Sequence, residues 1–500
     1  MLVNSLKLVT KEHGSRIAYK TAGRKAISFQ ELDQLSDEVG AWFKVNEVSE
    51  GSVVALCLPS HIEYIISYLA VAKIGGVTAG INPRFTSRER QKVLATLKPD
   101  LVITAAGFDA GVGSEHKSEK IKLNQNINQI MIQQRLTGES LETLETNPDR
   151  PVCICFTSGS TGKPKGAWFT NKQLQAISDL DTGGSWGGGG NRYASTEFAH
   201  VGVMTKLPWL LSSGGTTHLV EKWNAKEILE LIHNYKMTSV SAIAPQIALM
   251  LKQENIASFD FTSVKAIVTG GAFASPDLIQ AGRKIFGAPW SVRYSSTESG
   301  GIGLGTTLEA DDDEALFTVG KPRKGVKAKI CNAEGIELDQ GEIGEIWISS
   351  PAVMSGYWND PEATDDVLKN GWLKTGDLAY VNDNDCFVLA GRTKEMFIRG
   401  GYNVYPLEVE GVLSSHSKVS EIAIVPQLDE VMGEIGVAFV VPKSTKNPPT
   451  LEELREYGSR ELASFKLPEV VVIINEIPRN ATDKIDRRKL IEIIMNRDKN

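Results

Sequence analysis

Apolar and polar residues recur with two different periods along the first part of the chain. Residues 28–43, SFQELDQLSDEVGAWF, place apolar side chains three and four positions apart, which predicts an amphipathic helix. Ser28 is followed three residues later by Glu31, and this pair predicts a capping box at the start of that helix. Residues 52–60, SVVALCLPS, form a short apolar run that predicts a buried strand. Strands that alternate with helices predict parallel sheets covered by helices.

The pattern changes further along the chain. Strands and helices alternate again between 214 and 292, and short strands with turn residues follow from about 316. A basic segment and a fresh α+β pattern begin at 391. We therefore predict an α/β protein with a large N-terminal portion, 1–390, of helix-covered mixed or parallel sheets. It would include a small β-rich subdomain at about 316–390, and a small α+β domain would follow over 391–500.

Length, charge and apolar runs exclude several classes of protein. Five hundred residues exceed what one hydrophobic core usually serves. A net charge of -7 gives no indication of nucleic acid or an anionic membrane as a partner. The best candidate for a membrane span, 62–77, is too short and carries Glu63 and Lys73. With no signal-peptide pattern at the amino terminus, we predict a cytoplasmic protein without a transmembrane segment.

Two groups of potential metal ligands have simpler interpretations. Cys153 and Cys155 form a C-x-C pair on a predicted strand, but no further ligands cluster near them, which favours buried free thiols. Residues 309–314, EADDDE, predict a solvated acidic loop rather than a metal site.

A stretch of ten residues, TSGSTGKPKG at 157–166, has the composition of a phosphate-binding loop. Glycines allow backbone N–H groups to turn toward an anion, and the hydroxyl side chains add donors. The spacing excludes a Walker loop, because Gly159 and Gly162 are too close together and Pro164 follows Lys163. The loop is therefore expected to hold a nucleotide in another way.

Four further stretches follow that loop in order. They are YSSTESGG at 294–301, WLKTGD at 372–377, GRTKEMFIRGGYNVYPLEVE at 391–410 and PRNATDKIDRRKL at 478–490. Together with the loop, the chain resembles the acyl-adenylating (AMP-binding) enzyme family, which includes acyl-CoA synthetases, aryl-CoA ligases, firefly luciferase and the adenylation domains of peptide synthetases. The resemblance spans nearly the whole chain.

The resemblance implies a site for ATP and Mg²⁺. The loop would cover the β- and γ-phosphates, the Tyr294 ring would pack on adenine, and Asp377 would accept hydrogen bonds from the ribose hydroxyls. Glu298 would hold Mg²⁺, which prefers carboxylate oxygens and substrate phosphates. The residues that the resemblance assigns to ATP or AMP are Thr157, Ser158, Gly159, Ser160, Thr161, Gly162, Lys163, Lys165, Gly270, Gly271, Ala272, Tyr294, Thr297, Asp377 and Arg392.

The resemblance also implies the catalytic residues. Lys484 would reach the α-phosphate and the substrate carboxylate from the C-terminal domain, and His200 would lie beside that carboxylate. The residue before the lysine is usually glycine in the family but is Asp483 here, which can pair with a cation such as Arg487 or compete for Lys484. The expected catalytic residues are Lys484, Thr297, Glu298 and His200.

A mobile C-terminal domain is a further implication of the resemblance. It would pivot at Lys394 between two half-reactions and bring Gly400, Gly401 and Tyr402 to coenzyme A. A glycine suits the wall of a narrow tunnel for the pantetheine arm, because a side chain there would block the passage.

The expected activity is that of an AMP-forming acyl-CoA ligase. A carboxylic acid and Mg-ATP would give acyl-AMP and pyrophosphate, and coenzyme A would then take the acyl group. Amino-acid-activating relatives carry an aspartate near the histidine for the substrate ammonium; the stretch Phe198-Ala199-His200-Val201 has none, which disfavours amino acids because a buried ammonium is costly unpaired. A fatty acid is the favoured substrate.

Three alternatives stay open at this point. They are an aryl-acid CoA ligase, a ligase that loads a carrier protein, and a non-enzymatic nucleotide-binding protein, which the presence of Lys484 and Glu298 disfavours. The expected partners are small molecules (the acid, ATP and coenzyme A) and a second copy of the chain in a homodimer, with no nucleic acid.

Overall fold

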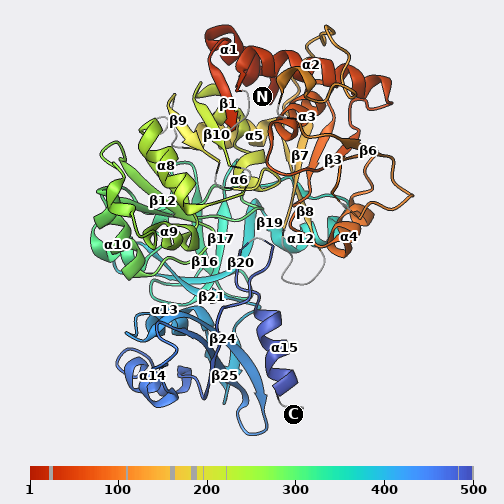
Figure 1. The fold of residues 1–500 in the computed structure, drawn as a ribbon. Coiled ribbons are helices and arrows are strands. Elements are labelled where there is room, and N and C mark those ends of the chain that lie inside the picture. Colours follow the sequence, from red (N-terminus) through yellow and green to blue (C-terminus); the bar gives the residue numbers. More distant parts are fainter. Residues whose placement is uncertain are drawn as a thin grey trace.

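The computed structural model describes residues 1–21, 26–108, 111–124, 126–157, 164–181, 189–194, 196–220, 222–481 and 483–497. These residues form five β-sheets with helices packed against them. Four of the sheets build a large N-terminal domain, and the fifth builds a small C-terminal domain, drawn in blue at the bottom of Figure 1. The predicted fold class, α/β with a small α+β C-terminal domain, is confirmed.

The largest sheet is mixed. Its central strands run parallel, and two antiparallel strands extend one edge. In spatial order its strands are β18 (Gly356–Tyr357), β8 (Gly166–Thr170), β7 (Pro151–Phe156), β4 (Val77–Gly80), β3 (Val53–Cys57), β5 (Leu101–Ala105) and β6 (Ser118–Ile121).

Two smaller sheets lie beside it in the N-terminal domain (Figure 1). The first has the order β2 (Ile27–Ser28), β1 (Ile17–Thr21), β10 (Thr216–Leu219) and β9 (Asn191–Tyr193). The second has the order β11 (Ser239–Ala242), β12 (Ala266–Gly270), β13 (Trp290–Tyr294), β14 (Leu304–Gly305) and β15 (Lys321–Pro322). In the second, β11, β12 and β13 are parallel, so their carboxyl ends share one edge.

Helices cover these sheets. In the N-terminal domain they are α1 (Leu2–His13), α2 (Phe29–Val45), α3 (Ile62–Lys73), α4 (Ser87–Leu97), α5 (Asn171–Leu180), α6 (Val201–Met204), α7 (Leu207–Ser212), α8 (Ala225–Tyr235), α9 (Ala244–Leu251), α10 (Pro276–Phe286), α11 (Asp312–Phe317) and α12 (Pro361–Val367), with short 3₁₀ turns η1 (Ile127–Gln129) and η3 (Ile256–Ser258). Helix α2 begins after Ser28 with the predicted capping box, in which Ser28 and Glu31 bond each other's backbone N–H.

The apolar run on β3 is buried on both faces. Val54 and Leu56 pack in the cluster that contains α2 and α3, whereas Val53 and Ala55 pack in the cluster that contains α4. Because side chains alternate along a strand, a run without polar residues requires a helix layer on each face.

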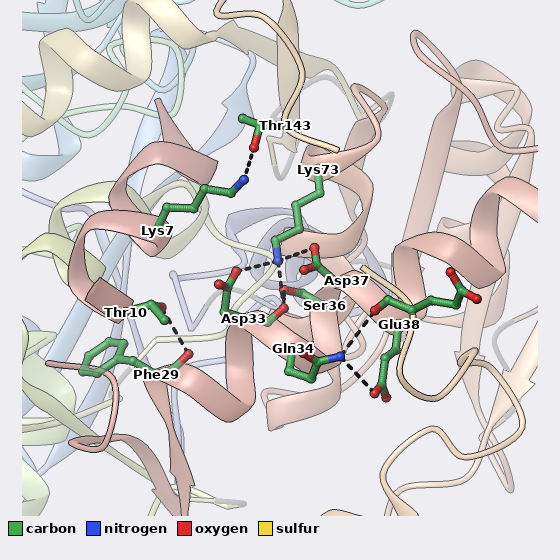
Figure 2. Close-up of polar contacts among 11 residues, drawn as sticks. Lys7, Thr10, Phe29, Asp33, Gln34, Ser36, Asp37, Glu38, Lys73 and Thr143 are labelled. Carbon is green, nitrogen blue, oxygen red and sulfur yellow. Dashed lines mark hydrogen bonds and ion pairs between the residues drawn. The ribbon is translucent and has the colours of Figure 1, made fainter. Parts of the chain in front are cut away.

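Helix α3, the strongest apolar segment of the sequence, lies inside the N-terminal domain. Its polar residue Lys73 is buried, and Nζ lies 2.6 Å from Asp33 Oδ1 and 2.7 Å from Asp37 Oδ1 on α2 (Figure 2). Glu63 is also buried and accepts a hydrogen bond from the Asn124 N–H at 3.0 Å. None of the helices that the structure describes combines the length and apolarity that crossing a bilayer requires.

A fourth sheet closes the N-terminal domain. It consists of β16 (Lys327–Cys331), β17 (Gly344–Ser349), β20 (Trp372–Val381) and β19 (Leu368–Lys369), with β21 (Phe387–Arg392) paired to β20. The acidic segment before it forms the start of α11 instead of the predicted loop. The Asp311 side chain caps that helix by accepting the Glu314 N–H, and carboxylates in a first helical turn are favoured by the helix dipole.

The C-terminal domain is an α+β unit. Its sheet has the order β23 (Tyr402–Val404), β22 (Phe397–Arg399), β25 (Gly433–Pro442) and β24 (Val419–Asp429), with β26 (Val470–Ile473) paired to β25. Its helices are α13 (Pro406–Ser414), α14 (Leu451–Gly458), α15 (Arg487–Arg497) and the 3₁₀ turn η4 (Ser464–Lys466). Helix α13 packs against β21, so the two domains meet where the closing sheet ends (Figure 1).

Candidate active site

A polar network joins three strands where the domains meet, with Tyr294 and Asp377 buried and Arg392 exposed. The Tyr294 hydroxyl, at the end of β13, donates to Asp377 Oδ2 at 2.7 Å, and Arg392 Nε lies 2.8 Å from Asp377 Oδ1. Burial and the nearby Asp377 carboxylate raise the pKa of Tyr294, so the phenol stays a donor. The Asp377 charge also raises the pKa of Arg392. Both oxygens of Asp377 are therefore held in place, and each retains a lone pair for another donor.

Glu298 lies four residues after Tyr294 in the chain and offers a carboxylate oxygen. Its Oε1 accepts the Tyr357 hydroxyl at 2.8 Å, which leaves Oε2 available. The Lys165 ammonium lies 4.9 Å from the centre of the Tyr357 ring, so the end of the phosphate-binding segment contacts the same group. No cluster of three His, Cys, Asp or Glu exists in the part of the chain that the structure describes. One oriented carboxylate fits Mg²⁺ that takes its other ligands from substrate phosphates and water.

Lys484 reaches this place from the C-terminal domain. It keeps solvent-accessible surface, yet protein surrounds it closely enough that desolvation is the main cause of its lowered pKa. The charge of Arg392 lowers the pKa further, and Asp377 and Glu298 oppose both effects. Lys484 is therefore exposed at the junction of the two domains, close to charged groups of the N-terminal domain.

His200 is exposed at the same junction, near Lys484, and its ring orientation is defined. It is the residue before α6, and its Nδ1 accepts the Gly202 N–H at 3.1 Å. Since Nδ1 is an acceptor, the proton of the neutral ring resides on Nε2, which is left as a donor. Desolvation, followed by the charges of Lys484 and Lys206, lowers the pKa of His200 to about 4. The imidazole is thus neutral at physiological pH.

The structure describes only some of the other residues expected to bind ATP. The Thr157 N–H donates to the Lys165 carbonyl at 2.9 Å, which closes the base of the phosphate-binding segment. Gly271 follows β12 with φ +76°, and a Cβ there would contact nothing within 4 Å. Gly270 is the last residue of β12, and Ala272 and Thr297 lie after β12 and β13, respectively. Ser158, Gly159, Ser160, Thr161, Gly162 and Lys163 lie outside the described residues.

The residues expected to bind coenzyme A contact other parts of the C-terminal domain. Gly400 and Gly401 form the turn between β22 and β23, and the Gly400 N–H donates to the Met432 carbonyl. The Tyr402 ring stacks on Phe465 at 4.6 Å. The contacts of these three residues thus lie within the C-terminal domain. The predicted hinge residue, Lys394, is exposed and lies just after β21.

Asp483 pairs with a cation, as one of the two interpretations expected, but that cation is Arg84 and not Arg487. Arg487 instead pairs with Glu410 at 2.6 Å and with Glu395 at 2.9 Å. The Asp483 carboxylate lies 2.8 Å from Nη1 of Arg84 in the N-terminal domain. Asp483 therefore neither binds Arg487 nor competes for Lys484.

Sequence reasoning missed several residues at the junction of the two domains. Tyr357, Arg84 and Lys206 carry no local motif, and their roles follow from contacts with distant segments. Lys206 Nζ lies 2.9 Å from Asp181 Oδ2, and its charge reaches His200. Only a motif that spanned these segments could have identified them.

Comparison with known proteins decides the family. The model described as AMP-binding enzyme matches residues 7–358, and the model described as AMP-binding enzyme C-terminal domain matches residues 408–484. The chain belongs to the AMP-binding enzyme family. Several of its relatives are CoA ligases by name, and the solved o-succinylbenzoate CoA synthetase from Bacillus subtilis has been seen with ATP and a magnesium ion.

Members of the AMP-binding enzyme family with varied substrates resemble the chain to similar degrees. Indoleacetate–CoA ligase from Aromatoleum aromaticum is 28% identical over 95% of this chain and 95% of its own length. Fatty acid–[acyl-carrier-protein] ligase ScoC from Streptomyces coeruleorubidus is 28% identical over 93% and 91%. The solved structure of o-succinylbenzoate CoA synthetase from Bacillus subtilis with its acyl-adenylate superposes with a TM-score of 0.85 at 26% identity, covering 97% of both chains.

Proposed function

We propose that the chain converts a carboxylic acid, with a fatty acid as the first candidate, into its CoA thioester through an acyl-adenylate. One observation supports this most directly: Lys484 of the small domain lies among Glu298, Asp377, Arg392 and His200 of the large domain. That arrangement places cationic and neutral donors beside a carboxylate suited to Mg²⁺, as transfer of the adenylyl group of ATP to a carboxylate requires.

In the first step a carboxylate oxygen of the acid attacks the α-phosphorus of ATP, and the bond to pyrophosphate breaks. The Lys484 ammonium would stabilise charge on the α-phosphate and on the attacking carboxylate, and Nε2–H of His200 would orient that carboxylate. Asp377 would accept from the ribose, with Tyr294 and Arg392 fixing its two oxygens. Glu298 and the ATP phosphates would hold Mg²⁺, which supplies charge neutralisation for the leaving group.

In the second step the sulfur of coenzyme A attacks the acyl carbonyl carbon, the thiol proton leaves to solvent, and AMP departs. Gly400, Gly401 and Tyr402 would reach the acyl-adenylate after the C-terminal domain turns at Lys394. The contacts of Gly400 and Tyr402 with Met432 and Phe465 move with that domain and so do not oppose such a rotation.

An apolar acid is favoured by the turn after β12. Phe273, next to Gly271 and Ala272, leaves 51% of its surface exposed, which provides an apolar contact for a substrate tail.

A second candidate class is an acid with a polar far end. The Lys206–Asp181 pair lies behind His200 and could meet a hydroxyl or carboxylate there. The cytoplasmic location and the homodimer stay predictions.

A substrate panel tests the proposed reaction. Aliphatic, aryl, dicarboxylic and amino acids are each incubated with Mg-ATP and coenzyme A, and AMP and thioester are measured. We expect both products with monocarboxylic aliphatic acids. Pyrophosphate exchange with amino acids alone would contradict the proposed substrate class, and a carrier protein that accepts acyl groups when coenzyme A does not would contradict the acceptor.

Lys484→Ala tests the proposed role of the lysine. We expect adenylation to slow by at least ~10²-fold, the usual cost of removing one strong donor to a transition state. Transfer from ready-made acyl-adenylate to coenzyme A should persist, because the lysine is not needed for that step. Adenylation at the wild-type rate would show that another cation fills the role.

A further inference from the structure

Arg84 connects the two domains through ion pairs on both sides. It lies between β4 and α4, where its own N–H donates to Asn82 Oδ1 at 2.9 Å. Its guanidinium places Nε 3.2 Å from Glu197 Oε1 and Nη1 2.8 Å from Asp483 Oδ2. A forked guanidinium can bind two carboxylates at once in fixed directions, so one side chain joins a segment of each domain.

The Glu197 side of this connection belongs to the segment that carries His200. The second oxygen of Glu197 accepts the Ser60 hydroxyl at 2.7 Å, and the Phe198 N–H donates to the same hydroxyl oxygen at 3.0 Å. The Glu197 carbonyl accepts the His200 N–H at 3.0 Å. Arg84 is therefore anchored to the backbone that positions His200.

The Asp483 side belongs to a tight turn that carries Lys484. Within it the Asn480 N–H donates to the Lys484 carbonyl at 2.8 Å, and the Asp483 N–H donates to the Asn480 carbonyl at 3.0 Å. The Arg479 guanidinium donates to the Asp483 carbonyl at 3.0 Å. Asp483 has φ +59°, a left-handed conformation that aspartate tolerates better than most residues. Because the turn is bonded internally, the position of the Asp483 carboxylate determines that of Lys484.

We propose that Arg84 and Asp483 form an interdomain clamp that favours the adenylating arrangement of the two domains and opens for the thioester step. The inference rests on the proposed function, because only a two-step ligase needs the domains to rearrange. Each side chain of the clamp is 43% exposed. A pair so exposed changes an equilibrium by about fivefold at most. Such a bias positions Lys484 without preventing the later rotation.

A double-mutant cycle tests the clamp in the full-length enzyme. Asp483→Asn removes the charge and keeps a residue that tolerates the left-handed turn, and Arg84→Gln removes the partner. We expect Asp483→Asn to slow adenylation by a factor of about two to five in the wild-type background and to have no further effect in the Arg84→Gln background, where that ion pair is already lost. Arg84→Gln also loses the pair with Glu197, so its own effect should be at least as large. Transfer from ready-made acyl-adenylate to coenzyme A should be unchanged or faster. Salt should reduce the difference from wild type.

Lys236→Gln is the matched control. It removes an exposed ion pair of 2.7 Å, to Asp260, that lies within the N-terminal domain, and it should leave both half-reactions unchanged. Equal slowing of both half-reactions in Asp483→Asn, multiplicative effects in the double variant, or wild-type adenylation in both single variants would each overturn the clamp. If the wild-type enzyme itself forms no thioester from any acid, the proposed function fails instead.

Discussion

Desolvation lowers the pKa values of individual residues at the junction of the domains. His200 and Lys484 both retain accessible surface, but the protein around them disfavours their charged forms and lowers both pKa values. The lysine lies near Asp377 and Glu298, which favour its charge, whereas the cations near His200 oppose a second positive charge. The two neighbouring donors thus differ: one is a cation with carboxylates around it, and the other is a neutral imidazole.

The neutral imidazole leads to a prediction about pH. The pKa of His200 falls from its ordinary 6.5 to about 4, so lowering the pH protonates the ring only near the lower value. We expect adenylation rates between about pH 5.5 and 8 to show no inflection that His200→Gln removes, although that variant should be slower overall. Measurement of the initial rate against pH for both proteins tests this. An inflection near 6.5 in the wild type that disappears in His200→Gln would contradict a neutral histidine.

Among the elements, α3 shows how an apolar helix tolerates a buried charge. Lys73 ends the helix, and its ammonium meets Asp33 and Asp37 on α2, which lie one turn apart (Figure 2). The Asp33 carbonyl also accepts from the same ammonium at 2.8 Å. A buried cation with three acceptors is stable, whereas one that loses its carboxylates is not. This pairing fixes how α2 and α3 pack on the largest sheet.

The pair Asp33→Asn with Asp37→Asn should therefore destabilise the fold. We expect the double variant to lower the free energy of unfolding by about 3 kcal/mol, because it leaves the Lys73 charge buried without an anion. Urea unfolding at neutral pH measures the change. Asp312→Asn is the control, since its pair with Arg283 at 2.6 Å is similarly short but Asp312 is 74% exposed, and it should cost about 1 kcal/mol or less. Equal losses in the two variants would contradict a special role of burial.

At the scale of the whole molecule, the observed arrangement suits the first half-reaction of the proposed function. Lys484 lies close to Asp377 and Glu298 of the N-terminal domain, while the turn at Gly400 and Gly401 contacts Met432 within the C-terminal domain. Under that proposal the C-terminal domain would turn to bring Gly400 and Gly401 to the site. The Arg84–Asp483 clamp lies beside Lys484 and would break in that rotation.

Gly401→Asn should separate the half-reactions. Gly401 has φ +87° and its Cβ would contact nothing in this arrangement, so asparagine, which tolerates positive φ, should fold normally. If Gly401 lines the pantetheine tunnel, thioester formation should fall by at least about tenfold while pyrophosphate exchange is retained. Gly371→Asn, at φ +80° in the turn between β19 and β20, is the matched control. Similar behaviour of the two variants would place the tunnel elsewhere.

The sequence by itself determined the elements and the motif residues. The apolar period and the Ser28–Glu31 pair predicted α2, and the apolar run at 52–60 predicted a buried strand, because both depend on neighbours within a few positions. The five ordered motifs identified the family for the same reason: each is a local spacing. The acidic segment at 309–314 was misread as a loop because the cap at Asp311 outweighed its polarity.

Only the tertiary structure decided which of those residues act together. Arg84 and Asp483 lie 399 positions apart, and Tyr294 and Asp377 lie 83 apart, so no local spacing could pair them. The proton on Nε2 of His200 and its low pKa follow from a backbone contact and from surrounding protein, neither of which the sequence displays. Local sequence patterns specify helices and strands because short-range sterics and side-chain periodicity act between residues a few positions apart. Which side chains pair, which protonation state His200 adopts and whether Arg84 meets Asp483 depend on which distant segments the fold brings into contact.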